Sequence, residues 1–167
     1  MRLFIRTVTK FTDITGKILM WLPWILMAII VWEVALRNVF GRPTIWAHEL
    51  SVMFFGALAI LGGAYTLRAR GHVSMDLFYN KLSERGRAVL DIITFPLFFA
   101  FVFTLLWYGT LFAMRSYASH EASISTWGPP LWPVKFTIPI GAFLLLIQGI
   151  AKLFSDILVA VKGERTE

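Results

Sequence analysis

The sequence contains no cysteine among its 167 residues. This excludes a disulfide framework, a zinc site with thiolate ligands and a cysteine-ligated iron–sulfur cluster. Charge is also scarce, because charged residues make up 16% of the chain, against about 25% in soluble domains. Hydrophobic residues make up 57%, and the mean hydropathy is +0.70. A chain of this size cannot bury that much apolar surface in water, so its composition predicts a protein of the lipid bilayer.

The net charge of +6 raises the question of a nucleic-acid partner. The basic residues lie at the edges of apolar stretches, and no long basic tract is present. That distribution is typical of membrane helices, whose orientation depends on Lys and Arg in the connections. We therefore expect no nucleic-acid partner.

Four apolar stretches are long enough to cross a hydrocarbon core of about 30 Å as helices. They lie at 18–36, 50–67, 89–112 and 136–161. The sequence predicts an all-α integral membrane protein, with residues 1–167 forming a single four-helix membrane domain. Residues 2–17 place apolar and basic side chains on opposite faces of a helix, which predicts an amphipathic helix at the cytoplasmic membrane surface. The apolar stretch after it is too long for a cleaved signal peptide, which favours an uncleaved signal anchor.

The basic residues predict how the four helices are oriented. Twelve lie before the first stretch, between the second and third, or near the C-terminus: Arg2, Arg6, Lys10, Lys17, Arg68, Arg70, Lys81, Arg85, Arg87, Lys152, Lys162 and Arg165. Four lie near the first and third connections: Arg37, Arg42, Arg115 and Lys135. Because cytoplasmic connections carry the excess of Lys and Arg, both termini are predicted to be cytoplasmic.

Ionisable and strongly polar groups within the apolar stretches are few. Glu33 and Arg37 lie one helical turn apart, which favours a structural ion pair over a proton or cation site. Gln148 is the main polar side chain deep in the fourth stretch, and alone it more often bonds another helix than a substrate. The second stretch has a small-residue side, which indicates either close helix packing or ordinary membrane-helix composition. It consists of Gly56, Ala57, Ala59, Gly62, Gly63 and Ala64.

Proline and glycine predict several breaks in the helices. Pro23 is expected to kink the first membrane helix, and Pro129, Pro130 and Pro133 to exclude regular helix before the fourth. Gly71 is expected to end the second membrane helix as a left-handed cap.

The three histidines fall in connections on two predicted sides of the membrane: His48, His72 and His120. Haem ligation needs histidines on facing helices, and zinc needs clustered ligands, so we expect no cofactor, no metal and no catalytic residue. This disfavours a respiratory-complex anchor. A self-contained proton-coupled exporter using Glu33 stays an alternative, although such a transporter is expected to show midplane polar groups or broken helices. The pattern favours an accessory or scaffold membrane subunit.

Several short motifs occur in a distinctive order. Glu33 is followed by Arg37 and Phe40, and Pro43 by Trp46 and Glu49. The segment RGHVSMD carries Arg70, Gly71, His72 and Asp76, and a later connection and helix carry Glu121, Ser125, Trp127, Pro130, Lys135, the IPIG sequence at 138–141 and Gln148. In this order, on four helices, the motifs resemble the small membrane subunit of tripartite ATP-independent periplasmic (TRAP) transporters, the DctQ-like family.

The resemblance implies a role that depends on partners in a bacterial inner membrane. A soluble periplasmic binding protein would capture an organic anion, and a large multi-span permease subunit would move it inward by an elevator-like motion driven by a sodium gradient. The small subunit would be a separate polypeptide that braces the large one, with membrane lipid around it. The motif residues would serve as subunit-interface or structural residues, with Glu33, Arg37 and Glu49 at the outer end of the contact and His72 and Asp76 at the inner end.

Overall fold

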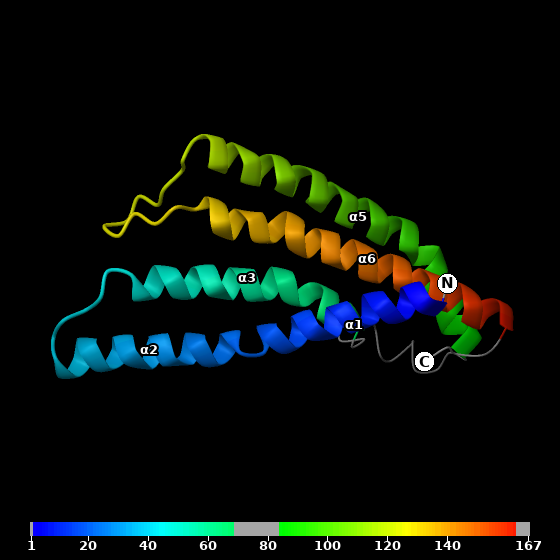
Figure 1. The fold of residues 1–167 in the computed structure, drawn as a ribbon, viewed down its shortest axis with the longest axis horizontal. Coiled ribbons are helices and arrows are strands. Elements are labelled where there is room, and N and C mark those ends of the chain that lie inside the picture. The colour runs from blue at the N-terminus through cyan, green and yellow to red at the C-terminus, as the bar shows by residue number, and fades with distance from the viewer. Residues whose placement is uncertain (1, 69–83, 163–167) are drawn as a thin grey trace.

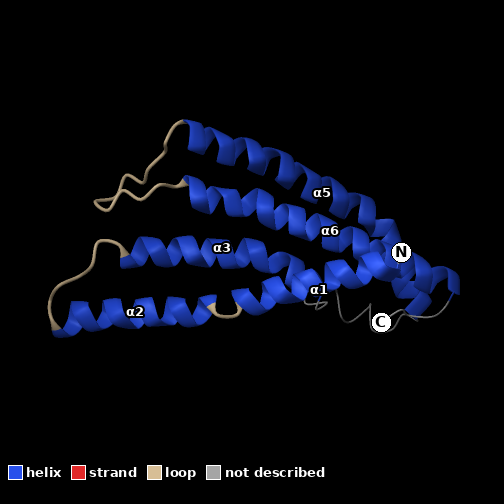
Figure 2. Cartoon of the chain, viewed as in Figure 1, coloured by secondary structure: helices blue, strands red, loops and turns tan. Residues whose placement is uncertain are grey.

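The computed structural model describes residues 2–68 and 84–162, and these residues are mostly helical (Figure 2). The helices are α1 (Arg2–Leu19), α2 (Leu22–Val39), α3 (Ala47–Arg68), α5 (Glu84–Ala118) and α6 (Trp132–Lys162). The described residues contain no β-strand, and their β-type pairing is a single isolated bridge between Ala122 and Pro130. The predicted all-α class is confirmed. The expected cap at Gly71 lies outside the described residues.

Within the described residues, four helical stretches are long and apolar enough to cross a membrane, so the chain is a multi-pass membrane protein. They are Arg6–Val39, Ala47–Leu67, Gly86–Ala118 and Trp132–Ala160. All four extend past the predicted bounds at one end or both, because helical backbone continues into the flanking sequence. The first begins at Arg6, so it includes most of the amphipathic segment that was predicted to lie at the membrane surface. α6 begins at Trp132, so the prediction that Pro133 excludes helix is wrong. Proline fits the first turn of a helix, where its missing N–H would have no partner.

The first stretch contains two helices rather than one kinked helix. α1 ends at Leu19 and α2 begins at Leu22, with Pro23 in the first turn of α2. The predicted kink at Pro23 is therefore a short break just before it, at a position where proline favours a helix start. The predicted amphipathic helix is present as α1. Val8, Thr12 and Leu19 are buried at helical spacing along one face, because α1 packs against α6 and α3.

α6 is the centre of the bundle, since it packs against α5, α3 and α1, whereas α2 packs against α3 (Figure 1). The connections at 40–46 and 119–131 lie at one end, which we call the loop end. The start of α1, the start of α5 and the end of α6 lie at the opposite end, which we call the terminal end. The four passes thus alternate in direction.

The interior is built from small side chains, and the large apolar side chains face outward. Val102 and Ser116 are the largest fully buried side chains among the described residues. Large exposed apolar residues occur on every helix, among them Phe11, Trp24, Phe55, Leu97 and Phe143. This arrangement suits a lipid solvent, in which helices associate through close packing of small residues rather than through the hydrophobic effect.

One glycine makes a close approach of two helices possible. A Cβ atom added at Gly141 on α6 would lie 2.8 Å from the backbone oxygen of Ile60 on α3. By contrast, a Cβ added at Gly56 or Gly62 would meet nothing within 4 Å. The predicted small-residue side of the second membrane helix therefore contributes little to packing at these two positions, whereas Ala64 of the same set is buried.

Candidate functional site

Several candidate site residues lie at the loop end, where α2 and α3 are joined. The Glu33 carboxylate accepts a hydrogen bond from the Thr44 backbone N–H, with 3.1 Å between the nitrogen and Oε2, and another from the Thr44 hydroxyl. The Thr44 hydroxyl oxygen in turn accepts from the Ala47 N–H at 3.3 Å, in the first turn of α3. Glu33 thereby fixes the connection to the start of α3.

The predicted ion pair between Glu33 and Arg37 is wrong. Both residues lie in the described part of the chain, and the structure places no ion pair between them. The physical reason is that the connection folds back and brings a hydroxyl and an N–H to the carboxylate, which satisfies it locally. Arg37 is exposed in the last turn of α2.

A second carboxylate joins the two connections of the loop end. Ser125, in the connection between α5 and α6, donates a hydrogen bond of 2.5 Å to Glu49 Oε2 in the first turn of α3. The Ser125 oxygen also accepts from the Gly128 N–H at 3.1 Å, and Gly128 has a φ of +59°, a backbone conformation that favours glycine. The negative charge of Glu49 is favourable at the N-terminus of α3.

A third carboxylate closes the base of the α5–α6 connection. Glu121 forms an ion pair with Lys135 in α6, and the Lys135 ammonium lies 4.1 Å from the centre of the Phe112 ring. The backbone of the same connection is fixed by the Leu131 N–H, which donates to the backbone carbonyl oxygen of Glu121 at 2.9 Å. The hydrogen bond from Lys135 is the main reason that the pKa of Glu121 lies below its ordinary value of 4.5.

The remaining predicted residues of the loop end belong to this framework. The Trp46 carbonyl accepts from the Leu50 N–H at 2.9 Å as α3 begins, and Pro130 pairs with Ala122 in the isolated bridge. Trp127 is 37% exposed. Beside them, Tyr117 meets Trp132 edge to face with 5.5 Å between ring centres, and such aromatic residues are typical of a membrane interface.

Gln148 lies near the middle of α6, and it bonds another helix, as predicted. The Thr12 hydroxyl of α1 donates a hydrogen bond of 2.9 Å to Gln148 Oε1. The two side chains are 4% and 5% exposed, so the pair is shielded from both lipid and water. A buried polar group needs such a partner, and here the chain supplies its own.

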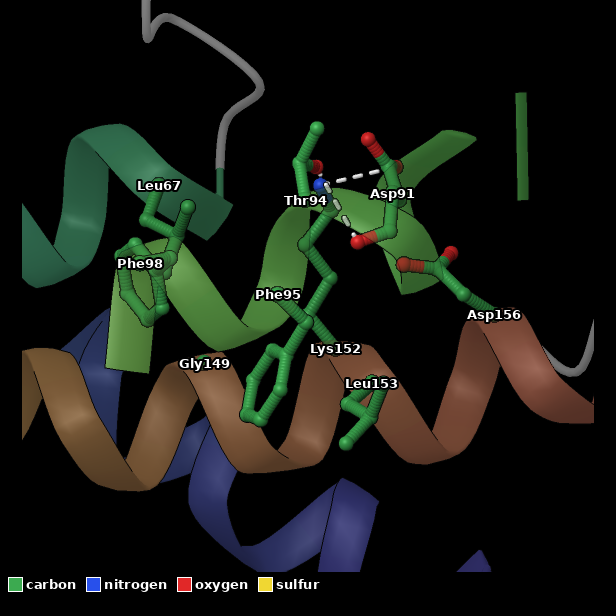
Figure 3. Close-up of a pocket in the computed structure, with 9 residues that line it drawn as sticks. All are labelled: Leu67, Asp91, Thr94, Phe95, Phe98, Gly149, Lys152, Leu153 and Asp156. Atoms are coloured by element: carbon green, nitrogen blue, oxygen red, sulfur yellow. Dashed lines mark hydrogen bonds and ion pairs between the residues drawn. The ribbon is translucent and has the colours of Figure 1, made fainter. Parts of the chain in front are cut away.

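At the terminal end, Lys152 of α6 pairs with Asp91 of α5, with 2.8 Å between Nζ and Oδ2. The pair borders an open pocket (Figure 3). Sequence reasoning missed Asp91, although a carboxylate inside the predicted 89–112 stretch was a signal. The other predicted residues of this end, Arg70, Gly71, His72 and Asp76, lie outside the described residues.

The bonds described above connect helices and loops of the same chain. They leave the carboxylates of the loop end occupied rather than open to a substrate. Within residues 2–68 and 84–162, no group of three or more His, Asp or Glu side chains is placed to hold a metal ion. The carboxylates of the loop end are each bonded to a hydroxyl or an ammonium of the same chain.

A family model for the DctQ component of tripartite ATP-independent periplasmic transporters matches residues 26–159, which is most of the chain. The chain belongs to this family. DctQ-family proteins are transporter subunits and not enzymes. Family membership also argues against the two alternatives, a self-contained exporter and a respiratory-complex anchor.

Three curated relatives agree with the assignment. The sialic acid TRAP transporter small permease protein SiaQ of Vibrio cholerae is 21% identical over 133 residues, which cover 78% of this chain and 73% of that protein. The C4-dicarboxylate TRAP transporter small permease protein DctQ of Rhodobacter capsulatus is 29% identical over 117 residues, or 68% of this chain and 50% of that protein. The sialic acid TRAP transporter permease protein SiaT of Haemophilus influenzae is 27% identical over 84 residues, or 50% of this chain and 14% of that protein.

Proposed function

We propose that this DctQ-family subunit is a brace for a large TRAP permease subunit and carries no cargo by itself. The observation that carries the proposal is the pair of Thr12 and Gln148. Gln148 is the strongly polar side chain in the middle of α6, and its acceptor oxygen is already used by α1. A transporter that moved a polar solute through this chain would need polar groups at mid-depth that are open to the solute.

The match to SiaT supports a large permease as the partner. The similar segment is 14% of that longer permease protein. A small-subunit sequence within a longer permease indicates that the two parts act together. The outward-facing apolar side chains of this chain could cover such a partner as well as lipid. We expect Glu33, Arg37 and Glu49 at the loop-end part of that contact.

The transported substrate and its delivery are proposed from the relatives' names. Sialic acid and C4-dicarboxylates are both organic acids, which supports uptake of an organic acid. We propose that a periplasmic binding protein delivers it and that a sodium gradient drives its uptake across a bacterial inner membrane. The distribution of Lys and Arg supports cytoplasmic termini and, with them, a loop end on the periplasmic side.

Co-purification directly tests the proposal that this chain binds and stabilises a large permease subunit. The full chain with an affinity tag would be expressed with and without a large TRAP permease subunit from the same organism. We expect the permease to co-purify in a constant ratio and to lose yield when the small subunit is omitted. Independent purification of the two proteins, with undiminished permease yield, would contradict the proposal.

A further inference from the structure

The connection between α5 and α6 forms a closed loop, 121–131, that projects past the ends of both helices (Figure 1). Two backbone hydrogen bonds of 2.9 Å close it, from the Ser123 N–H to the Pro129 oxygen and from the Leu131 N–H to the Glu121 oxygen. Ile124 lies just beyond them, and its relative exposure is 106%, so the described part of the chain leaves its side chain uncovered. The loop therefore presents one large apolar side chain to its surroundings.

Side-chain bonds fix the position of this loop in the molecule. The Ser125 hydroxyl, next to Ile124 in the sequence, donates a hydrogen bond to the Glu49 carboxylate of α3. The ion pair of Glu121 with Lys135 attaches the base of the loop to α6. A segment that is already ordered loses little conformational freedom when it binds a partner. The loop therefore holds Ile124 in a defined position before any partner binds.

The composition of the loop favours a protein partner over lipid. Residues 122–131 include no charged side chain, so this segment has no Lys or Arg to bind a lipid phosphate. Its tip is exposed at Ser125, Thr126 and Gly128, and the backbone N–H and C=O groups there need hydrogen-bond partners that a hydrocarbon core does not offer. The centre of a protein interface is depleted in charged residues and is more apolar than the rest of the surface. An apolar side chain on an uncharged, ordered loop fits such a centre.

We propose that Ile124 inserts into an apolar pocket of the large TRAP permease subunit. A soluble protein that docks and leaves would return Ile124 to water after each encounter, whereas permanent interfaces are the more apolar class. The loop is also bonded to Glu49, which we expect in the loop-end part of the contact with the permease. The inference rests on the proposed function and names the side chain that anchors the complex.

Affinity measurements on the full-length chain test the contact. The tagged chain would be co-expressed with a large TRAP permease subunit from the same organism, and the dissociation constant obtained by diluting the purified complex. We expect Ile124→Ser to weaken the association about tenfold, as for truncation of an interface anchor, and Ile124→Leu, which keeps an apolar side chain, to bind like the wild type. Thr126→Ala is the matched control, because Thr126 is exposed in the same loop but adds little apolar surface; it should leave the dissociation constant unchanged. Ile124→Ser alone should melt at the wild-type temperature, because the replaced side chain is uncovered.

A cysteine at the same position identifies the partner. The chain has no cysteine of its own, so Ile124→Cys supplies its only thiol for reaction with a charged maleimide. We expect this thiol to react when the chain is alone in lipid nanodiscs and to be protected when the permease is present without the binding protein. Protection by lipid alone, protection only after the binding protein is added, or equal dissociation constants for the wild type and Ile124→Ser would overturn the inference and leave the proposed function intact. Failure of the wild-type chain to bind the permease would overturn both.

Discussion

Thr12 and Gln148, 136 positions apart in the sequence, form a buried hydrogen bond of 2.9 Å that fastens α1 to the middle of α6. The bond shows that the amphipathic N-terminal helix, which was expected only at the membrane surface, is attached to the helix bundle. One face of α1 belongs to the helix bundle, and the acceptor oxygen of Gln148, which could otherwise contact a solute, is bonded within the chain.

The contribution of this bond to stability can be measured by a double-mutant cycle. Thr12→Val removes the donor, keeps the shape and leaves Gln148 unpaired, so it should lower the free energy of unfolding by about 1 kcal/mol, within the range of hydrogen bonds between membrane helices. In the double variant with Gln148→Leu, part of this loss should be recovered, because no polar group is then left unpaired. Thermal unfolding in one detergent would give the values, and strict additivity of the two changes would contradict the bond.

The close approach of α6 to α3 predicts that replacing glycine by alanine lowers the stability of the chain by different amounts at two positions. Gly141→Ala should destabilise the chain by about 1–3 kcal/mol, because the added methyl group meets the Ile60 backbone, which cannot move aside cheaply. Gly56→Ala is the matched control and should leave the isolated chain as stable as the wild type, since its surroundings are open. The two melting temperatures in detergent would decide, and equal values would rule out the packing described here.

Glu33 is predicted to depend on Thr44 and not on Arg37. Thr44→Val removes the hydroxyl that binds the carboxylate and caps α3, so it should cost about 1.5 kcal/mol, the lower end for a hydrogen bond to a charged group. Arg37→Gln should change stability by less than about 0.5 kcal/mol, as expected for an exposed side chain. Urea unfolding in mild detergent would measure the free energy of unfolding of both variants. A larger decrease for Arg37→Gln than for Thr44→Val would support the ion pair inferred from the sequence.

The α5–α6 connection should weaken in acid. The pKa of Glu121 is lowered in the folded chain by Lys135, so the carboxylate contributes stability that is fully present above its ordinary value of 4.5. That contribution is lost as the pH falls through the lowered pKa. The stability difference between wild type and Glu121→Gln should therefore be constant at neutral pH and shrink below about pH 4.5. A difference that stayed constant down to pH 3 would show that the pair is not coupled to folding.

The sequence predicted the features that depend on local pattern. The four apolar stretches, the amphipathic helix and the bonding of Gln148 to another helix follow from composition, periodicity and the cost of an unpaired polar group in a membrane. The partner of Gln148 could not be predicted, because helix pairing in a bundle depends on tertiary packing. The same is true of Lys152, whose partner Asp91 lies on another helix. The wrong partner was predicted for Glu33, because Arg37 is its neighbour within the helix. Thr44 approaches Glu33 only because the connection after α2 folds back.

Solute flux through the isolated subunit tests the central claim most directly. The purified chain would be reconstituted in liposomes alone, and in parallel with the large permease and the binding protein, and uptake of labelled sialic acid and C4-dicarboxylates would be measured with an imposed sodium gradient. We expect no flux above empty liposomes for the chain alone, and uptake of an organic acid only when its partners are present. Sustained uptake by the chain alone would show that it holds a solute pathway of its own.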